Sequence, residues 1–385
     1  MKILEIYNRA SSAEQFVGDR FKFLIENGGY EMYLVATPND SVENFSIAMG
    51  VHYYPVMLSR HVSVKNDIKA IVKIAKYIKT NKIDIVVTSN AKGVVVGQIA
   101  AYLAGVRHRV ILAHGVLFDT MHGLKKTLVK LPLKFASKLS TEIVCVSKSV
   151  QRRRLEEGID TQKSNVCVLG NGSPAGIDTM YQFNPNNIET DEISSIRENL
   201  AISANDFIIG FCGRLVRDKG IVELIEAFNI LKNKSPQKRL KLLIIGEREN
   251  WDGIPLEIMN ILKNDTDIIF TGRVPHSTIH KYYALMDVFV LPSFREGFPT
   301  VVMEASAMGL PVITTRSTGC IDSILEGKTG LYSEISAEKI ADAVEILYNK
   351  EYAHTLGMNG REWMMSCFEH TKMNQYWLDF FNALS

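Results

Sequence analysis

The sequence has few cysteines and no cysteine motif. The five cysteines among its 385 residues are Cys145, Cys167, Cys212, Cys320 and Cys367. They are odd in number, far apart and without a C-x-x-C pair, which argues against a zinc site or a disulfide framework. We therefore expect the protein to work in a reducing compartment.

The sequence also lacks a long apolar run. Its longest uncharged apolar stretch, residues 93–106, is shorter than the roughly 20 residues that cross a bilayer. Residues 1–7 (MKILEIY) contain Glu5, and no small-residue cleavage site follows them, so we expect no signal peptide. These absences predict a cytoplasmic protein without a membrane span.

The composition shows no strong bias. With 46% hydrophobic and 22% charged residues, it is typical of a soluble globular protein and excludes disordered and fibrous classes. The length suits two domains. The net charge of +2 hides an asymmetry, because residues 1–175 hold 24 Lys and Arg against 14 Asp and Glu, whereas residues 176–385 hold 20 against 28. A basic half joined to an acidic half indicates two bodies with different partners.

Short β-type runs alternate with helical patterns in both halves. We expect strands at residues 3–7, 32–36, 51–54, 83–88, 110–113, 143–146 and 166–169, and again at 207–212, 240–245, 268–271, 288–291 and 312–314. This alternation predicts an α/β protein with two doubly wound, Rossmann-like domains that face each other across a cleft. Ligands of such sheets bind beyond the carboxyl ends of the strands.

The domain boundaries follow from composition. Residues 1–172 form the first expected domain, and residues 206–365 form the second. Residues 173–205 are rich in Gly, Asn, Pro, Ser and Asp without a sustained apolar period, so we interpret them as a linker with one short helix.

The loop after the strand at 288–291 carries the first binding signal, EGFPTVVMEA. Pro299 can open a helix at its first position, where its missing N–H costs nothing. The amides of Thr300 and Val301 then lie at a helix N-terminus, which favours an anion. Gly297 allows a ligand to approach the backbone closely.

Two carboxylates flank this helix start. Glu296 precedes the helix and Glu304 lies within it. Because carboxylates accept hydrogen bonds from vicinal hydroxyls, this arrangement suits a diphosphate between two polyols. The alternative is that both merely complement the helix dipole and solvent, which we favour for Glu296 taken alone. Glu304 stands among apolar residues, where a solvated carboxylate is less expected.

A second signal, GRLVRDKG (213–220), follows the strand at 207–212. Arg214 and Lys219 offer a planar fork and a point charge, both suited to a diphosphate. Fixed cations there would stabilise the charge that develops on a leaving phosphate. The alternative is a solvated loop with Arg217 paired to Asp218, and we adopt it for Arg217.

These motifs resemble a known family. EGFPTVVMEA (296–305), GRLVRDKG (213–220) and TGRVPHSTIHKYYALMDVFVLPS (271–293) occur in the order found in family 4 of the retaining, nucleotide-sugar-dependent glycosyltransferases, which have the GT-B fold. GNGSPAGID (170–178) at the domain junction extends the resemblance, which is to the bacterial surface-polysaccharide type. It implies an acceptor-side first domain, a donor-binding second domain, and a C-terminal helix at 366–385 that crosses back to the first domain.

The resemblance also implies residue roles. Glu304 would hold the ribose, Glu296 with the following amides the donor sugar, and Arg214 with Lys219 the diphosphate; His114 in ILAHGV would touch the donor sugar from the first domain. The expected catalytic residues are Glu296, His114, Arg214 and Lys219, and the expected donor-binding residues are Glu304, Gly297, Phe298, Pro299, Thr300, Val301, Arg273, Val274 and Gly213. A lone histidine after a strand is more often structural, but Gly115 and the family context favour a functional His114.

The first strand–helix loop departs from the family. Many relatives have glycines there, whereas this chain has Asn8, serines and Glu14. The hydroxyls of Ser11 and Ser12, with Ala13, could substitute for close backbone approach, or the loop could shape the acceptor site. Both interpretations stay open.

The metal question turns on one short motif. Asp265 and Asp267 form a D-x-D, but they precede the strand at 268–271 and so stand at its wrong end, which predicts a solvated turn. The resemblance implies no metal and no cofactor beyond the UDP-sugar co-substrate. No G-x-G-x-x-G follows the first strand, which argues against a dinucleotide oxidoreductase.

Residues 123–140 (GLKKTLVKLPLKFASKLS) predict a basic amphipathic helix that Pro132 kinks or divides. Lys126, Lys130, Lys134 and Lys138 recur every four residues and form one stripe. Such a helix can lie on an anionic membrane, or it can be an ordinary helix with a solvated lysine face. The basic first half favours the membrane, at the inner face of the cytoplasmic membrane; nothing indicates nucleic-acid binding.

The sequence thus predicts a retaining glycosyltransferase. It would move a hexose or N-acetylhexosamine from a UDP-sugar to a polyprenyl-diphosphate-linked glycan in surface polysaccharide or glycan biosynthesis. A nucleotide-sugar epimerase on the same fold and a non-catalytic nucleotide-sugar-binding subunit remain as alternatives.

Overall fold

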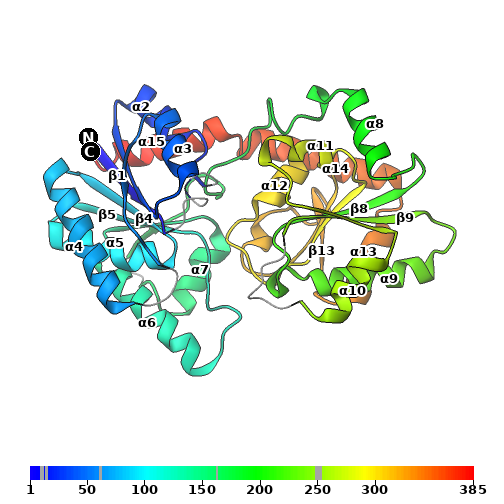
Figure 1. Ribbon diagram of the computed structural model, residues 1–385, viewed down its shortest axis with the longest axis horizontal. Helices are drawn as coiled ribbons and strands as arrows, with labels where there is room; N and C mark the ends of the chain where they lie inside the picture. The colour runs from blue at the N-terminus through cyan, green and yellow to red at the C-terminus, as the bar shows by residue number, and fades with distance from the viewer. Residues whose placement is uncertain (9–12, 14–15, 60–62, 162–163, 248–253) are drawn as a thin grey trace. The chain divides into compact units, whose positions relative to one another are not determined.

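The chain folds into two compact units (Figure 1). The computed structural model describes residues 1–8, 13, 16–59, 63–161, 164–247 and 254–385. Unit 1 comprises Met1–Gly176 and His370–Ser385, and unit 2 comprises Ile177–Glu369. The chain therefore leaves unit 1 four residues after the end of the first expected domain. Most of the segment expected as a linker belongs to unit 2, where α8 (Thr190–Asn199) contains the expected short helix.

Unit 1 is built on a seven-stranded parallel sheet with the order β3-β2-β1-β4-β5-β6-β7. Its strands are β1 (Lys2–Ile6), β2 (Glu31–Ala36), β3 (His52–Pro55), β4 (Ile85–Ser89), β5 (His108–Ala113), β6 (Glu142–Cys145) and β7 (Asn165–Cys167). Its helices are α2 (Arg20–Gly28), α3 (Asp40–Met49), α4 (Val64–Asn81), α5 (Ala91–Ala104), α6 (Gly123–Leu139), α7 (Lys148–Glu156) and α15 (His370–Asn382).

Burial explains the central strands and their covering helices. Every residue of β4 is buried, as expected of a parallel strand covered on both faces. In α4, Ala70, Ile74 and Ile78 are buried at helical spacing and belong to a core cluster shared with α5 and the sheet. The helices α4, α5 and α6 pack in succession.

Unit 2 is built on a six-stranded parallel sheet with the order β10-β9-β8-β11-β12-β13. Its strands are β8 (Phe207–Cys212), β9 (Leu240–Ile245), β10 (Ile268–Gly272), β11 (Val288–Leu291), β12 (Val312–Thr315) and β13 (Gly330–Ser333). Besides α8, its helices are α9 (Ile221–Lys234), α10 (Leu256–Asn264), α11 (Ile279–Tyr283), α12 (Thr300–Ala307), α13 (Ala337–Ile346) and α14 (Lys350–Cys367), and its 3-10 turns are η1 (Pro185–Asn187), η2 (Arg217–Lys219), η3 (His276–Thr278) and η4 (Cys320–Asp322). Both units are thus doubly wound Rossmann-like α/β domains, as predicted, although β13 was not expected.

The weak sequence signal of β13 has a structural reason. It is a short edge strand that begins at Gly330. A side chain there would place its Cβ 2.5 Å from the Val312 carbonyl oxygen of the neighbouring strand. The glycine that the packing requires is also the residue that weakens the strand pattern.

Unit 1 holds its returning helix α15 through buried polar contacts. The Arg20 guanidinium, fully buried, donates two hydrogen bonds to Glu5 at 2.8 and 2.9 Å and one to the Pro174 carbonyl at 3.1 Å. It also lies 4.5 Å from the centre of the Trp377 ring. Arg20 therefore joins β1, the last residues before the chain leaves unit 1, and α15.

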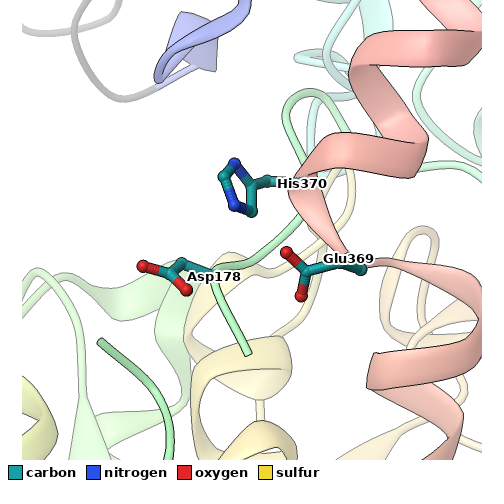
Figure 2. Close-up of side chains that lie close together, drawn as sticks. All are labelled: Asp178, Glu369 and His370. Carbon is teal, nitrogen blue, oxygen red and sulfur yellow. The ribbon is translucent and has the colours of Figure 1, made fainter. Parts of the chain in front are cut away.

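The chain passes from one unit to the other twice, after Gly176 and after Glu369. At both crossings, side chains are held by hydrogen bonds within their own unit. Figure 2 shows Asp178, Glu369 and His370 at these crossings. Asp178 accepts backbone hydrogen bonds from Met180 and the residues after it, and Glu369 accepts one from the Thr179 amide at 3.0 Å. His370 is bound to Asp19 at 3.0 Å. These bonds explain the three polar side chains as structural anchors.

Candidate active site

The candidate site residues of unit 2 follow the carboxyl ends of its parallel strands. Gly213 and Arg214 follow β8, Arg273 and Val274 follow β10, and the 296–301 segment follows β11. Since the sheet is parallel, these loops share one edge. The structure thus brings the sequence-predicted donor residues of this unit to one end of the sheet.

The loops after β8 and β11 are joined by ion pairs. Lys219, at the end of η2, forms an ion pair with Glu296, and both side chains are largely buried. Beside them, Arg295 binds Asp218 through two nitrogens at 2.6 and 2.9 Å. The two loops therefore form a single charged platform with a lysine and a carboxylate at its centre.

The β12 loop supports Glu296 from the other side. The Glu296 amide donates to the Thr318 carbonyl at 2.8 Å. Gly319 has φ of 81°, and a Cβ there would lie 2.5–2.6 Å from the backbone of Glu296 and Gly297. Only glycine fits this close approach, so the position of Glu296 depends on Gly319.

Glu304 is a buried carboxylate held by two partners. It is 5% exposed, and its Oε2 accepts a hydrogen bond of 2.7 Å from the Tyr283 hydroxyl. Its Oε1 lies 3.2 Å from Nε2 of His276. This contact raises the pKa of His276, whereas burial raises the pKa of Tyr283 well above its usual value. Glu304 is therefore a fixed acceptor and not a solvated surface charge.

The helix that carries Glu304 begins one residue later than predicted. Pro299 is its N-cap and not its first residue, and this proline makes no side-chain hydrogen bond to the helix. Thr300 and Val301 occupy the first turn, where a helix supplies no internal acceptor for the amides. The side chain of Phe298 is buried against Phe368, with ring centres 5.2 Å apart. Only the backbone of Phe298 is therefore a candidate for binding.

The expected pairing of Arg217 is wrong. Arg217 binds Glu223 of α9 at 2.7 Å, because Asp218 is already bound to Arg295. Arg214 is exposed at the end of β8. Gly246 after β9 comes so close to Gly213 that a Cβ would lie 1.8 Å from the Gly213 carbonyl oxygen, which fixes the spacing of these two loops.

The D-x-D motif lies at the amino end of β10, the end opposite to the site residues, as its place in the sequence predicts. From the sequence we expect a solvated turn, but the carboxylates of this motif form ion pairs with lysines. Lys232 binds Asp265 at 3.2 Å and Asp267 at 2.6 Å, and Lys241 binds Asp267 at 3.0 Å. The hydrogen bond from Lys232 lowers the pKa of Asp267 below its usual value.

His114 of unit 1 follows β5 and stacks on Phe16, with ring centres 4.3 Å apart. Its Nε2 is buried and has no hydrogen-bond partner among the described residues. Burial, with a smaller contribution from the Arg20 charge, lowers the pKa of His114 to about 3. His114 is therefore a neutral imidazole, and within the described part of the chain its Nε2 has no hydrogen-bond partner.

The first loop is described only in part. Ser11 and Ser12 lie outside the described residues, whereas Ala13 is fully buried. Its methyl group packs in the interior and offers no surface to a ligand.

The predicted lysine stripe of α6 is divided between two environments. Lys126 and Lys130 bind the same carboxylate of Glu157 at 2.8 and 2.7 Å, while Lys134 and Lys138 are exposed. The hydrogen bonds from Lys126 and Lys130 lower the pKa of Glu157 to about 2. The helix continues through Pro132 without division. Along the described chain, no helix is both long and apolar enough to cross a membrane.

Sequence reasoning found the carboxylates, Lys219 and the loops, but it missed the partners of Glu304. Tyr283 and His276 lie inside the 271–293 motif that carried the resemblance, yet neither was given a role. Only the motif itself could have pointed to them. Tyr283 and His276 precede Glu304 by 21 and 28 residues, and contacts over such separations leave no local pattern in the sequence.

Comparisons with known proteins identify the family of the chain. Residues 192–363 match the family described as "Glycosyl transferases group 1", and residues 17–147 match "Glycosyl transferase 4-like". The chain is 30% identical over 342 residues to the capsular polysaccharide biosynthesis glycosyltransferase CapM of Staphylococcus aureus, covering 86% of this chain and 84% of CapM. It is 29% identical to the UDP-Gal:alpha-D-GlcNAc-diphosphoundecaprenol alpha-1,3-galactosyltransferase of Escherichia coli, covering 77% and 74% of the two chains. The Anabaena protein HepE, solved with UDP and glucose, superposes with a TM-score of 0.80 at 18% identity over 99% of both chains.

Proposed function

Because the chain belongs to the group 1 glycosyltransferases and has their GT-B fold, we propose that it transfers a hexose or N-acetylhexosamine from a UDP-sugar to a polyprenyl-diphosphate-linked glycan, with retention at the anomeric carbon. One observation supports the donor class. Lys219, the carboxylates Glu296 and Glu304, and the start of α12 all lie beyond the carboxyl ends of the strands of unit 2.

The donor roles follow from the chemistry of these groups. Glu304, fixed by Tyr283 and His276, keeps lone pairs for the vicinal hydroxyls of a ribose. Lys219 has three N–H donors, so it can bind a phosphate oxygen while it stays paired with Glu296. Glu296 then accepts hydrogen bonds from the donor sugar.

The reaction breaks the bond between the anomeric carbon and the phosphate oxygen and forms one to the acceptor oxygen. The acceptor proton passes to the departing phosphate, and the electron pair of the broken bond stays with UDP. Lys219, Arg214 and the first amides of α12 would stabilise the charge that develops on UDP. The proposal assigns this task to side chains and amides, without a metal.

His114 would act as a neutral partner. With its pKa lowered to about 3, it cannot serve as a cationic acid near neutral pH. Its Nε2, to which no described residue is hydrogen-bonded, suits a hydrogen bond with a hydroxyl of the donor sugar.

The names of the relatives support the acceptor class. The Escherichia coli relative names a diphosphoundecaprenol acceptor and a UDP-sugar donor, and the Staphylococcus aureus relative names capsular polysaccharide biosynthesis. We extend this class to the present chain, in the assembly of a bacterial surface polysaccharide. Such an acceptor also implies work at the inner face of the cytoplasmic membrane.

Titration calorimetry with UDP, GDP, ADP and a panel of UDP-sugars, with EDTA present, tests the donor part. We expect UDP and one UDP-sugar to bind and EDTA to have no effect. Transfer is then assayed with short polyprenyl-diphosphate sugars, and NMR of the product gives the anomeric configuration. Binding of no nucleotide would refute the proposal, and so would conversion of the UDP-sugar without acceptor, which is the behaviour of an epimerase.

A further inference from the structure

The outward face of α6 is apolar. Leu124, Leu128, Leu131 and Phe135 are 76%, 62%, 58% and 54% exposed. Their spacing of four, three and four residues puts them in one row on the helix. The buried residues Leu133, Ala136 and Ser137 lie on the opposite side. Four large apolar side chains in one exposed row are unusual on a soluble protein, and such a patch marks an interaction surface.

The charges of α6 are all of one sign. The helix contains five lysines and no acidic residue. Lys126 and Lys130 point inward to Glu157 and lie within 6 Å of the Phe118 ring. Lys125, Lys134 and Lys138 are exposed, and no ion pair involves them among the described residues. The apolar row is therefore flanked by unpaired positive charge.

The neighbouring layer has the same character. On α4, Val64, Ile68 and Val72 are exposed at intervals of four residues. Lys65, Lys69, Lys73, Lys76 and Lys79 are exposed on the same helix. Its single acidic residue, Asp67, is occupied by Lys92 at 2.7 Å. The layer of α4, α5 and α6 thus combines apolar side chains with lysines and offers almost no free carboxylate.

The geometry points to a membrane-docking surface: the row Leu124, Leu128, Leu131 and Phe135 of α6 inserts among the acyl chains of an anionic bilayer, and Lys125, Lys134 and Lys138 bind its headgroups. This inference rests on the proposed function in one respect: the lipid-linked acceptor proposed there lies in a bilayer, which gives the protein a reason to dock. It differs from the sequence prediction, because the inserting residues are the exposed leucines and Lys126 and Lys130 take no part.

Charge selects this occupant over a second copy of the chain. Two copies of α6 packed by their apolar rows would bring lysines together without a carboxylate to compensate them. An anionic bilayer offers acyl chains to the leucines and phosphates to the lysines at the same time.

Vesicle flotation tests the docking surface. Wild-type protein is mixed at low salt with vesicles of phosphatidylglycerol and phosphatidylethanolamine, or of phosphatidylcholine. We expect binding to the anionic vesicles that salt weakens. The double variant Leu124→Ser/Leu128→Ser should lose more than about tenfold in affinity. Its folding should be unaffected, because both side chains are exposed. Leu256→Ser, at 77% exposure in unit 2, and Ile47→Ser, at 74% on α3, are matched controls that should bind as wild type.

A lysine variant tests the headgroup contacts. Lys134→Gln/Lys138→Gln should weaken anionic binding by about fivefold per charge. A tryptophan at position 128 (Leu128→Trp) should shift its emission to shorter wavelength on binding, which reports insertion. Equal binding of the leucine variant and wild type, absence of binding by wild type, or a dimer that the leucine variant abolishes would each overturn the inference.

Donor calorimetry on the same samples keeps the two proposals apart. If wild-type protein bound UDP-sugar but did not bind vesicles, the docking surface alone would be overturned. Vesicle binding without UDP-sugar binding would leave the docking surface in place and refute the proposed donor.

Discussion

The Tyr283 hydroxyl donates a hydrogen bond of 2.7 Å to Oε2 of Glu304, and both side chains are buried. The bond joins the end of α11 to the interior of α12. It fixes the carboxylate that we propose as the ribose ligand. If Glu304 binds the donor as we propose, Tyr283 acts on the donor through Glu304 and is a positioning residue.

Tyr283→Phe should weaken donor binding with little change in turnover. The variant keeps the ring and removes the hydroxyl that donates to Glu304, so the carboxylate loses its fixed orientation. A hydrogen bond to a charged group is worth about 1.5–3 kcal/mol, which sets the upper limit of the loss. Calorimetry with UDP-sugar, and kcat and KM measured separately, test this. Tyr282→Phe, the neighbouring tyrosine, is the control. An equal fall in kcat for Tyr283→Phe would contradict a positioning role.

Replacement of Glu304 itself should have a larger effect on binding. In Glu304→Ala the ribose loses its acceptor and the buried Tyr283 hydroxyl loses its partner, so both donor affinity and thermal stability should fall. Glu304→Gln should recover the stability, because the amide oxygen still accepts from Tyr283, while donor affinity stays low. If Glu304→Ala bound UDP-sugar like the wild type, the assignment of Glu304 would be wrong.

The other charged pair of the site should affect turnover. Lys219 and Glu296 hold each other across the loops after β8 and β11. Without Lys219 the developing charge on UDP loses a fixed cation, and we expect Lys219→Gln to reduce kcat by roughly 10²–10³-fold. Glu296→Gln should also reduce kcat more than it raises KM. Lys241→Gln removes a lysine that is ion-paired at the opposite edge of the same sheet and serves as the control in steady-state kinetics. Unchanged kcat in both site variants would remove these residues from the mechanism.

Periodicity and turn residues were sufficient to predict most of the fold. Strands such as β4 and helices such as α9 have long apolar signals, and the expected range 207–212 coincides with β8. The strand β13 was missed because its four residues include Gly330, which packing against Val312 requires. Local pattern does not reveal a glycine that tertiary contact selects.

The placement of the candidate site residues was predictable where they lie in loops or helix starts that follow parallel strands. Glu296, Glu304, Arg214 and Lys219 follow strands in recognisable motifs. The ion pairs were harder to predict from the sequence, because several charged residues that are close in the fold compete for the same partner. Arg217 binds Glu223 since Arg295 occupies Asp218, and α6 turns two of its lysines inward because Glu157 lies beside it. The exposed leucine row of α6 follows from that orientation, which helical spacing alone does not fix.

The D-x-D motif should be dispensable for activity. Its carboxylates are occupied by Lys232 and Lys241 at the edge of the sheet opposite to the site. Asp265→Asn/Asp267→Asn should leave transfer unchanged in the presence and absence of EDTA. Partly exposed ion pairs contribute about 0–1 kcal/mol each, so the melting temperature should fall only slightly. A loss of activity that added divalent metal restores would show that the motif serves the reaction.

His114 should make the protein less stable as pH falls. Its folded pKa of about 3 lies below the unfolded value of 6.5, so between these values the unfolded chain binds a proton that the folded chain does not. Stability is therefore highest above pH 6.5 and decreases as pH falls toward 3. At pH 5 the cost is about 2 kcal/mol relative to pH 8. His114→Gln lacks this titration. Urea unfolding at pH 8 and pH 5 measures the free energy of unfolding of both proteins. Between pH 8 and pH 5, wild type should lose about 2 kcal/mol more of this free energy than the variant. Parallel pH profiles for the two proteins would mean that folding does not lower the pKa of His114, which would contradict the burial of its imidazole as a neutral group.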